Sequence, residues 1–196
     1  MAEFIARNHP VLRERAKEIA PSEIGNPSIK KLIKEMRKAL HGEDDGVAIA
    51  APQLGHALRL FVVSGRIFEL KGKGGLEALA EGKAVPLKKK KGKPHPNDMV
   101  FVNPRIVKES KDAEWMVEGC LSLRWLYGRV KRKKRVTIEA YDERGRKFTR
   151  GAGGLLAQIF QHECDHLEGV LFTDKAKDVE DIPPELQREH GKTYVE

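Results

Sequence analysis

Residues 153–169 read GGLLAQIFQHECDHLEG, and this stretch decides the fold because it predicts a helix that carries two histidines on one face. Two glycines precede the helix, and Gly169 suits the left-handed position just past its end. His162 and His166 are four residues apart, so at about 100° per residue their rings stand roughly 40° apart. Both rings can therefore reach one metal ion.

Apolar residues share the histidine face. Leu155 and Ile159 lie on it, so we expect that face to be buried. Two buried imidazoles without partners would cost roughly 1 to 3 kcal/mol each, and a shared metal removes that cost. Glu163 lies about 60° from His166 around the axis, where it can move protons without binding the metal itself. A bare pair at this spacing also occurs among ordinary surface or core histidines, but the intervening glutamate favours metal-assisted hydrolysis.

The third protein ligand decides the class of a catalytic metal site, which needs three ligands and one open position. The sequence offers two candidates. Cys120 follows a strand-like stretch and a glycine, in Glu118-Gly119-Cys120-Leu121-Ser122. Glu185 follows Pro183-Pro184 in a segment with little apolar content, and would indicate a zinc endopeptidase. Cys120 is the better candidate.

Composition indicates one globular domain spanning residues 1–196. Hydrophobic residues make up 40% of the chain and charged residues 34%, enough for a core beneath an ionic surface. No apolar run approaches the roughly 20 residues that cross a bilayer, and the start does not resemble a signal peptide, so we expect a cytoplasmic protein with no membrane partner. Two cysteines in such a chain rarely form a disulfide, and Cys164 reads as a small buried hydrophobe. The net charge of +8 favours encounter with polyanions.

Periodicity predicts the remaining elements. Asn26-Pro27 opens a helix that His41-Gly42 ends, and the small residues of 46–55 suggest a ligand groove. Residues 65–97 are rich in Gly, Lys and Pro, which predicts an exposed basic insertion with a short helix near 76–79. Residues 175–196 are predicted to form a surface tail that contributes little to the fold. Strands are expected in antiparallel pairing at 58–63, 99–102, 105–107, 114–117 and 136–141, the last ending in a hairpin turn at 142–145.

Three separated segments resemble, in order, the three signature motifs of the peptide deformylases. Residues 46–53 (GVAIAAPQ) look like the first motif, 118–122 (EGCLS) match the second, and 162–169 (HECDHLEG) match the third. Weaker similarity runs from His9 to Asp174, apart from the insertion. The resemblance implies an α+β fold in which antiparallel sheets pack around a central helix that carries the HExxH motif.

The resemblance also implies a function, removal of the formyl group from the N-terminal formyl-methionine of newly made proteins. By similarity, Glu163 acts as general base and then acid while water activated by the metal attacks the formyl carbon. The residues that the resemblance assigns are the metal ligands Cys120, His162 and His166, the oxyanion donors Gln53 and the backbone N–H of Leu121, and a buried ion pair of Glu118 with Arg132.

Substrate binding is expected along the first motif. The peptide backbone would pair with Gly46, Val47 and Ala48 in an extended form, and Ile159 would form one wall of an apolar pocket for the methionine side chain. The family usually has a second glycine where this chain has Ala48. It also continues differently after Ser122, where this chain places the bulky residues of 123–127.

The resemblance to the family also indicates which metal and which partners to expect. A ligand set of one Cys and two His accommodates zinc, iron(II), nickel or cobalt, and the resemblance implies one divalent metal, Fe²⁺ in the cell. N-formylmethionyl nascent peptides are the expected substrates. The lysines of 87–93 suggest a transient contact with ribosomal RNA, and a third hypothesis is a ribosome-binding or RNA-binding homologue that has lost activity. The sequence does not indicate an oligomeric state.

Overall fold

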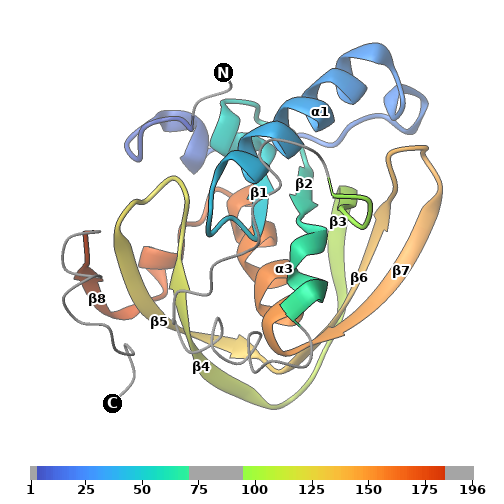
Figure 1. Cartoon of the computed structure of the whole chain (residues 1–196). Coiled ribbons are helices and arrows are strands. Elements are labelled where there is room, and N and C mark those ends of the chain that lie inside the picture. The colour runs from blue at the N-terminus through green and yellow to red at the C-terminus, as the bar shows by residue number, and fades with distance from the viewer. Residues whose placement is uncertain (1–3, 71–94, 184–196) are drawn as a thin grey trace.

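The computed structural model describes residues 4–70 and 95–183, and over that range the chain has an α+β architecture with two antiparallel sheets (Figure 1). The larger sheet has the strand order β1-β2-β3-β6-β7 and the smaller one β4-β5-β8. The helices and strands are α1 (Pro27–Gly42), β1 (Ala48–Ala50), β2 (Leu60–Val63), β3 (Met99–Glu109), β4 (Ala113–Gly119), β5 (Leu126–Lys133), β6 (Arg135–Tyr141), β7 (Lys147–Gly153), α3 (Gly154–Leu167) and β8 (Lys177–Asp181). The predicted fold class is confirmed.

Helix α3 occupies the middle of the molecule, with the β4–β5 hairpin on one side of it and the larger sheet on the other (Figure 1). Gly153 is its N-cap, and Gly169 has a φ of +73° just beyond its end. A Cβ atom at Gly169 would lie 2.5 Å from the Arg13 carbonyl oxygen, so glycine is needed there for space as well as for conformation. The helix predicted from residues 153–169 is confirmed.

The larger sheet is buried on both faces at β1, β2 and the first half of β3. Phe61 of β2 points toward α3, where its ring stacks on Phe101 with centroids 4.6 Å apart, and Phe160 of α3 packs edge-on against Phe101. Leu60 and Val62 point to the opposite face and pack against α1. Because both faces are covered, all four residues of β2 are buried.

Helix α1 covers the outer side of the larger sheet. Its apolar residues recur at helical spacing and are buried as predicted, while Asn26 occupies the N-cap position without a side-chain cap hydrogen bond. The remaining turns are 3-10 helices at Pro10–Arg13, Pro21–Glu23, Ala51–Leu54, Gly65–Leu70 and Phe172–Asp174.

Three expectations from the sequence differ from the structure. Gly65, Arg66 and Ile67, which were expected in an exposed insertion, are buried, because this turn packs beneath the end of α1. Residues 177–181 of the expected surface tail are all exposed, as predicted, but they form β8 and pair with β5, and Ile182 is buried. Strands β5 and β7 were not predicted, since their charged or small residues hide the apolar alternation. The strands expected at 99–102 and 105–107 form the single strand β3.

Other expectations lie outside the described residues. These are the short helix near 76–79, the lysines of 88–91 and Glu185. Within residues 4–70 and 95–183, no helix is long and apolar enough to cross a bilayer.

Candidate metal centre

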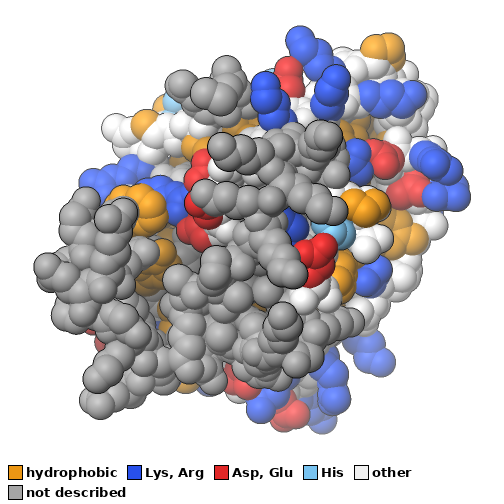
Figure 2. All heavy atoms as spheres, viewed as in Figure 1, with side chains coloured by type: hydrophobic (Ala, Val, Ile, Leu, Met, Phe, Trp, Pro, Cys, Tyr) orange, Lys and Arg blue, Asp and Glu red, His pale blue; other side chains and the backbone are white. Residues whose placement is uncertain are grey.

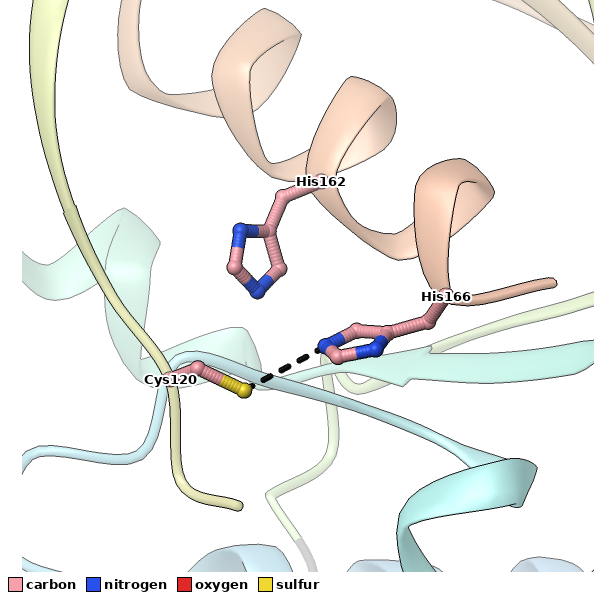
Figure 3. Close-up of side chains that lie close together, drawn as sticks. All are labelled: Cys120, His162 and His166. Atoms are coloured by element: carbon pink, nitrogen blue, oxygen red, sulfur yellow. Dashed lines mark hydrogen bonds between the residues drawn. The ribbon is translucent and has the colours of Figure 1, made fainter. Parts of the chain in front are cut away.

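Three side chains from two distant segments converge beside α3 (Figure 3). Cys120 immediately follows β4, and His162 and His166 point from one face of α3 toward its sulfur. The thiol Sγ lies 3.3 Å from Nε2 of His166, and the two imidazole centroids are 4.9 Å apart. One donor atom from each residue lies within 4.8 Å of the other two, which brings together the three residues that the sequence favoured. We call these three residues the donor cluster.

A glycine positions the cysteine at the end of β4. A Cβ atom at Gly119 would lie 2.8 Å from the Tyr127 ring on the paired strand β5. A larger residue would therefore displace the Tyr127 ring that packs over the end of β4. This explains why the chain has glycine directly before the cysteine.

Behind the donor cluster, a buried carboxylate orients His162. Nδ1 of His162 lies 2.9 Å from Oε2 of Glu118, so the other ring nitrogen faces the cluster. Glu118 in turn accepts two hydrogen bonds from Arg132, at 2.6 and 2.8 Å. The buried ion pair expected between Glu118 and Arg132 is confirmed.

Electrostatics favour an anionic sulfur and an anionic Glu118. Burial alone would raise the pKa of Cys120, but the neighbouring imidazoles of His166 and His162 lower it to about 5. Burial likewise opposes ionisation of Glu118, yet Arg132 and His162 lower the pKa of its carboxyl to about 2. Burial raises the pKa of the other cysteine, Cys164, to about 12, so that thiol is inert at neutral pH.

Two buried polar atoms at the centre have no hydrogen-bond partner among the described residues. They are Oε2 of Glu163 and Nδ1 of His166. Burial also raises the pKa of Glu163 to about 7. A buried polar group without a partner costs free energy, so its presence points to a ligand or a chemical role.

Gln53, expected as an oxyanion donor, lies beside the cysteine. Its Oε1 accepts a hydrogen bond from the Ala50 N–H at 2.8 Å, and this bond fixes which way the amide points. Its Nε2 then donates to Sγ of Cys120 at 3.4 Å and to Oγ of Ser122 at 3.3 Å. Leu121, whose backbone N–H is the second expected donor, is half-buried between Cys120 and Ser122. The first and second motifs thus meet at the donor cluster.

The segment expected to bind the peptide lies beside the edge of the larger sheet. Ala48 begins β1, which among residues 4–70 and 95–183 is the last strand of that sheet on its side and pairs with β2. The Gly46 carbonyl accepts a hydrogen bond from the buried Arg66 guanidinium at 3.2 Å, and the Val47 carbonyl accepts from the Ser64 N–H at 2.8 Å. These bonds hold Gly46 and Val47 in place beside the strand.

The remaining expected residues are placed as follows. Ile159 is buried in the core cluster that also contains Ala48. In the unusual segment after Ser122, Arg124 forms ion pairs with Glu43 and Asp45, at 2.7 Å each. This segment is therefore tied to the loop that precedes Gly46.

Sequence reasoning missed several supporting residues. Asp165 accepts hydrogen bonds from Arg132 and Lys175, both at 2.6 Å, and so extends the chain of charges behind His162. The Ser122 hydroxyl holds the Gln53 amide. Asp165 lies inside the third motif and Ser122 inside the second. Their position within the motifs was the signal that could have identified both residues.

The donor set fits a divalent transition metal. Thiolate and imidazole are ligands that zinc, iron(II), nickel and cobalt accept, and three protein ligands leave a position for substrate. The neighbouring imidazoles lower the pKa of Cys120, which favours the thiolate form that binds a metal. The carboxylate behind His162 is the kind of outer partner that orients metal-binding histidines.

Comparisons with known proteins agree on one family. Residues 1–181 match the family model described as polypeptide deformylase. The chain is 37% identical over 174 residues to a peptide deformylase of Roseiflexus castenholzii, covering 88% of this chain and 86% of that protein. It is 36% identical over 175 residues to the chloroplastic and mitochondrial peptide deformylase 1A of Arabidopsis thaliana, covering 89% of this chain but 61% of that longer protein.

Solved structures of the same family share the fold. The peptide deformylase of Synechococcus elongatus, solved in complex with actinonin, superposes with a TM-score of 0.71 at 28% identity, covering 96% of this chain and 82% of that one. The peptide deformylase of Thermotoga maritima gives a TM-score of 0.70 at 28% identity, covering 90% of this chain and 98% of that one.

Proposed function

This chain belongs to the peptide deformylase family, enzymes that remove the N-formyl group from nascent peptides with a single divalent metal, and we propose that it performs that reaction at the donor cluster. In this proposal Cys120, His162 and His166 bind the metal, and Glu163 moves the protons. The observation that carries the proposal is the convergence of one sulfur and two imidazoles, from segments far apart in the chain, beside a buried glutamate.

The bound metal supplies Lewis acidity, which polarises the formyl carbonyl and makes a nucleophile available near neutral pH. Glu163 does the proton work. Its buried, unpartnered Oε2 accepts a proton from the attacking water, whose oxygen bonds to the formyl carbon. Glu163 then donates that proton to the amide nitrogen as the carbon–nitrogen bond breaks, so the products are formate and a peptide with a free N-terminal amine.

Gln53 and Leu121 stabilise the negative charge that develops on the formyl oxygen. Nε2 of Gln53 is already held toward Cys120 by the bond between its Oε1 and the Ala50 N–H, so it needs little reorganisation. The backbone N–H of Leu121, next to the cysteine in the chain, is the second donor. Donors of this kind contribute about 2.7 to 4 kcal/mol each to transition-state stabilisation.

The substrate lies along the edge of the larger sheet. An extended peptide pairs with Gly46, Val47 and Ala48, where β1 has no strand beyond it within the described sheet. The methionine side chain enters an apolar pocket next to α3, with Ile159 in its wall. Recognition through the backbone lets the site accept many sequences after methionine.

The metal in the cell is Fe²⁺ in this proposal, and zinc, nickel or cobalt fit the same donors. The protein also makes a transient contact with the ribosome while it acts on nascent chains. Deletion of 87–93 followed by salt-dependent co-sedimentation with ribosomes tests that contact. Unchanged co-sedimentation would dismiss the lysines of that segment as the contact.

Formate release tests the activity directly. Protein loaded with iron under anaerobic conditions is incubated with formyl-Met-Ala-Ser, and formate and the new amine are measured, with casein digestion in parallel. We expect formate and amine in equal amounts and no digestion of casein. Proteolysis without formate would instead support a zinc endopeptidase, and neither product would support a homologue that has lost activity.

A further inference from the structure

The outer face of the smaller sheet carries a row of positive charges. Alternate residues of β5 point outward, so Arg129, Lys131 and Lys133 share one face while Val130 and Arg132 are buried on the other. The strand register places Lys177 of β8 opposite Arg129 and Trp115 of β4 opposite Lys131. We call these residues the basic face: Trp115, Arg129, Lys131, Lys133 and Lys177.

The four cations of the basic face have no acid partner in the part of the chain that the structure describes. Among residues 4–70 and 95–183, no carboxylate forms an ion pair with any of the four. Opposite Lys133 and Arg129 on β4 stand the neutral residues Ala113 and Val117. The acids of β4 alternate onto the inner side, as Glu118 does where it pairs with Arg132. One acid, Glu180 of β8, stands opposite Tyr127 at the end of the basic face.

The register also sets two like charges directly opposite each other. Arg129 stands opposite Lys177 across β5 and β8, and like charges in this arrangement destabilise a sheet. Several other arginines pair closely with acids, for example Arg146 with Asp142 at 2.7 Å. The four cations of the basic face instead stand together on one sheet face without an ion-pair partner among the described residues.

An exposed tryptophan lies among these charges. Trp115 is 40% exposed, one of three large hydrophobic residues that are exposed in the described part of the chain. Nζ of Lys177 lies 5.0 Å from the centroid of its ring. Aromatic rings on a basic sheet surface offer a stacking platform for unpaired bases, while the cations contact the phosphates.

We propose that the basic face binds single-stranded RNA, with Arg129, Lys131, Lys133 and Lys177 on the phosphates and a base stacked on Trp115. The opposite side of the same sheet holds Glu118, which faces His162 and the donor cluster. RNA on the basic face therefore leaves the metal centre open to a peptide. The inference goes beyond the proposed deformylation, and either can fail without the other.

Fluorescence anisotropy of a labelled oligouridine of about 20 nucleotides tests the charges. The variant R129E/K131E/K133E in the full chain should bind at least tenfold more weakly. The slope of log affinity against log salt should also fall by about 2. The matched control is K30E/K34E/K38E, which makes the same change in net charge on the exposed side of α1, where basic side chains also gather (Figure 2). The control should stay within about threefold of the unmodified protein, because those lysines lie on a different surface.

Trp115→Ala separates stacking from charge. It should weaken RNA binding about fivefold or more while the salt slope stays unchanged, because no phosphate contact is lost. Thermal unfolding checks that each variant is folded. Equal losses in the two triple variants, no effect of Trp115→Ala, or tighter binding to phosphatidylserine vesicles than to RNA would each overturn the proposal.

Discussion

Two buried polar clusters differ in how completely their atoms are paired. The Asp98 cluster, formed by Asp98, His41 and Arg66 at the end of α1, is satisfied. One oxygen of Asp98 accepts from the Gly65 N–H at 2.9 Å and the other lies 2.7 Å from Nε2 of His41. The Arg66 guanidinium donates to three backbone carbonyls. None of the buried polar side-chain atoms of these three residues lacks a partner, although Nε of the adjacent Arg37, 3.8 Å from Asp98, donates no hydrogen bond among the described residues.

The donor cluster is equally buried but incompletely paired. Oε2 of the neighbouring Glu163 and Nδ1 of His166 have no partner among the described residues. A fully paired cluster stabilises the fold, whereas a cluster with unpartnered atoms keeps hydrogen-bonding capacity for something that binds. The comparison predicts that substitutions in the Asp98 cluster lower stability and that substitutions around the donor cluster lower metal binding or activity.

Glu163→Gln gives the largest expected effect on activity. The amide keeps the size of the side chain but cannot accept and return a proton, so formate release should fall about 10²- to 10⁴-fold. Metal content, measured by atomic absorption, should not change, because Glu163 is not a ligand in this account. A loss of metal along with activity would show that Glu163 binds the metal instead.

Cys120→Ser tests the sulfur as a ligand. Loss of one of three protein ligands should lower metal affinity by more than the roughly 10- to 100-fold that loss of an outer hydrogen-bond partner costs. Competition with a chromophoric chelator measures the affinity. Cys164→Ser is the matched control and should leave it nearly unchanged, and equal effects of the two substitutions would remove Cys120 from the site.

Glu118→Gln probes the carboxylate behind His162. The amide cannot hold the imidazole as strongly, so metal affinity should fall about 10- to 100-fold, less than in Cys120→Ser. Arg132 also loses its buried partner, so stability should fall as well. The same chelator competition and a thermal unfolding scan measure both effects. Unchanged metal affinity would mean that Glu118 serves the fold alone.

Asp98→Asn tests the satisfied cluster and has the smallest expected effect on the site. Burial alone would raise the pKa of Asp98, but hydrogen bonds from His41 and from the N–H groups of Gly65 and His95 bring it below the ordinary 3.8. Because the folded-state pKa is lowered, the stability from this carboxylate is present above pH 3.8 and is lost as pH falls through the lower, folded-state pKa.

The variant should therefore lose about 1 to 3 kcal/mol of unfolding free energy at neutral pH and show a weaker acid dependence. Urea unfolding at several pH values measures this. Metal affinity, measured in parallel, should be unchanged. A variant whose stability falls with acid as steeply as that of the unmodified protein would contradict the assignment.

Short-range patterns predicted much of this molecule. The helix of residues 153–169 and the face of α1 follow from apolar periodicity and from glycine at the ends, and both are confirmed. Strands β5 and β8 were missed because partner strands, rather than their own apolar residues, stabilise them. Local sequence does not record which strands will be neighbours.

In the candidate site, too, local patterns predicted some residues and long-range contacts determined the others. The histidine spacing and the second motif predicted which residues to examine. The expected partnership of Glu118 with Arg132 came from resemblance, because nothing in their spacing indicates that the two side chains form an ion pair. The strand register sets Glu118 opposite Gly128 and Arg132 opposite Glu114. The contacts of Asp165 and Ser122 with other segments depend on long-range packing, which no local pattern encodes.

X-ray absorption at the zinc edge of the zinc-loaded protein tests the central claim most directly. The account predicts one sulfur at about 2.3 Å, two imidazole nitrogens at about 2.0 to 2.1 Å and one further light atom. The sulfur contribution should vanish in Cys120→Ser and persist in Cys164→Ser. A spectrum without sulfur in the unmodified protein would contradict the account.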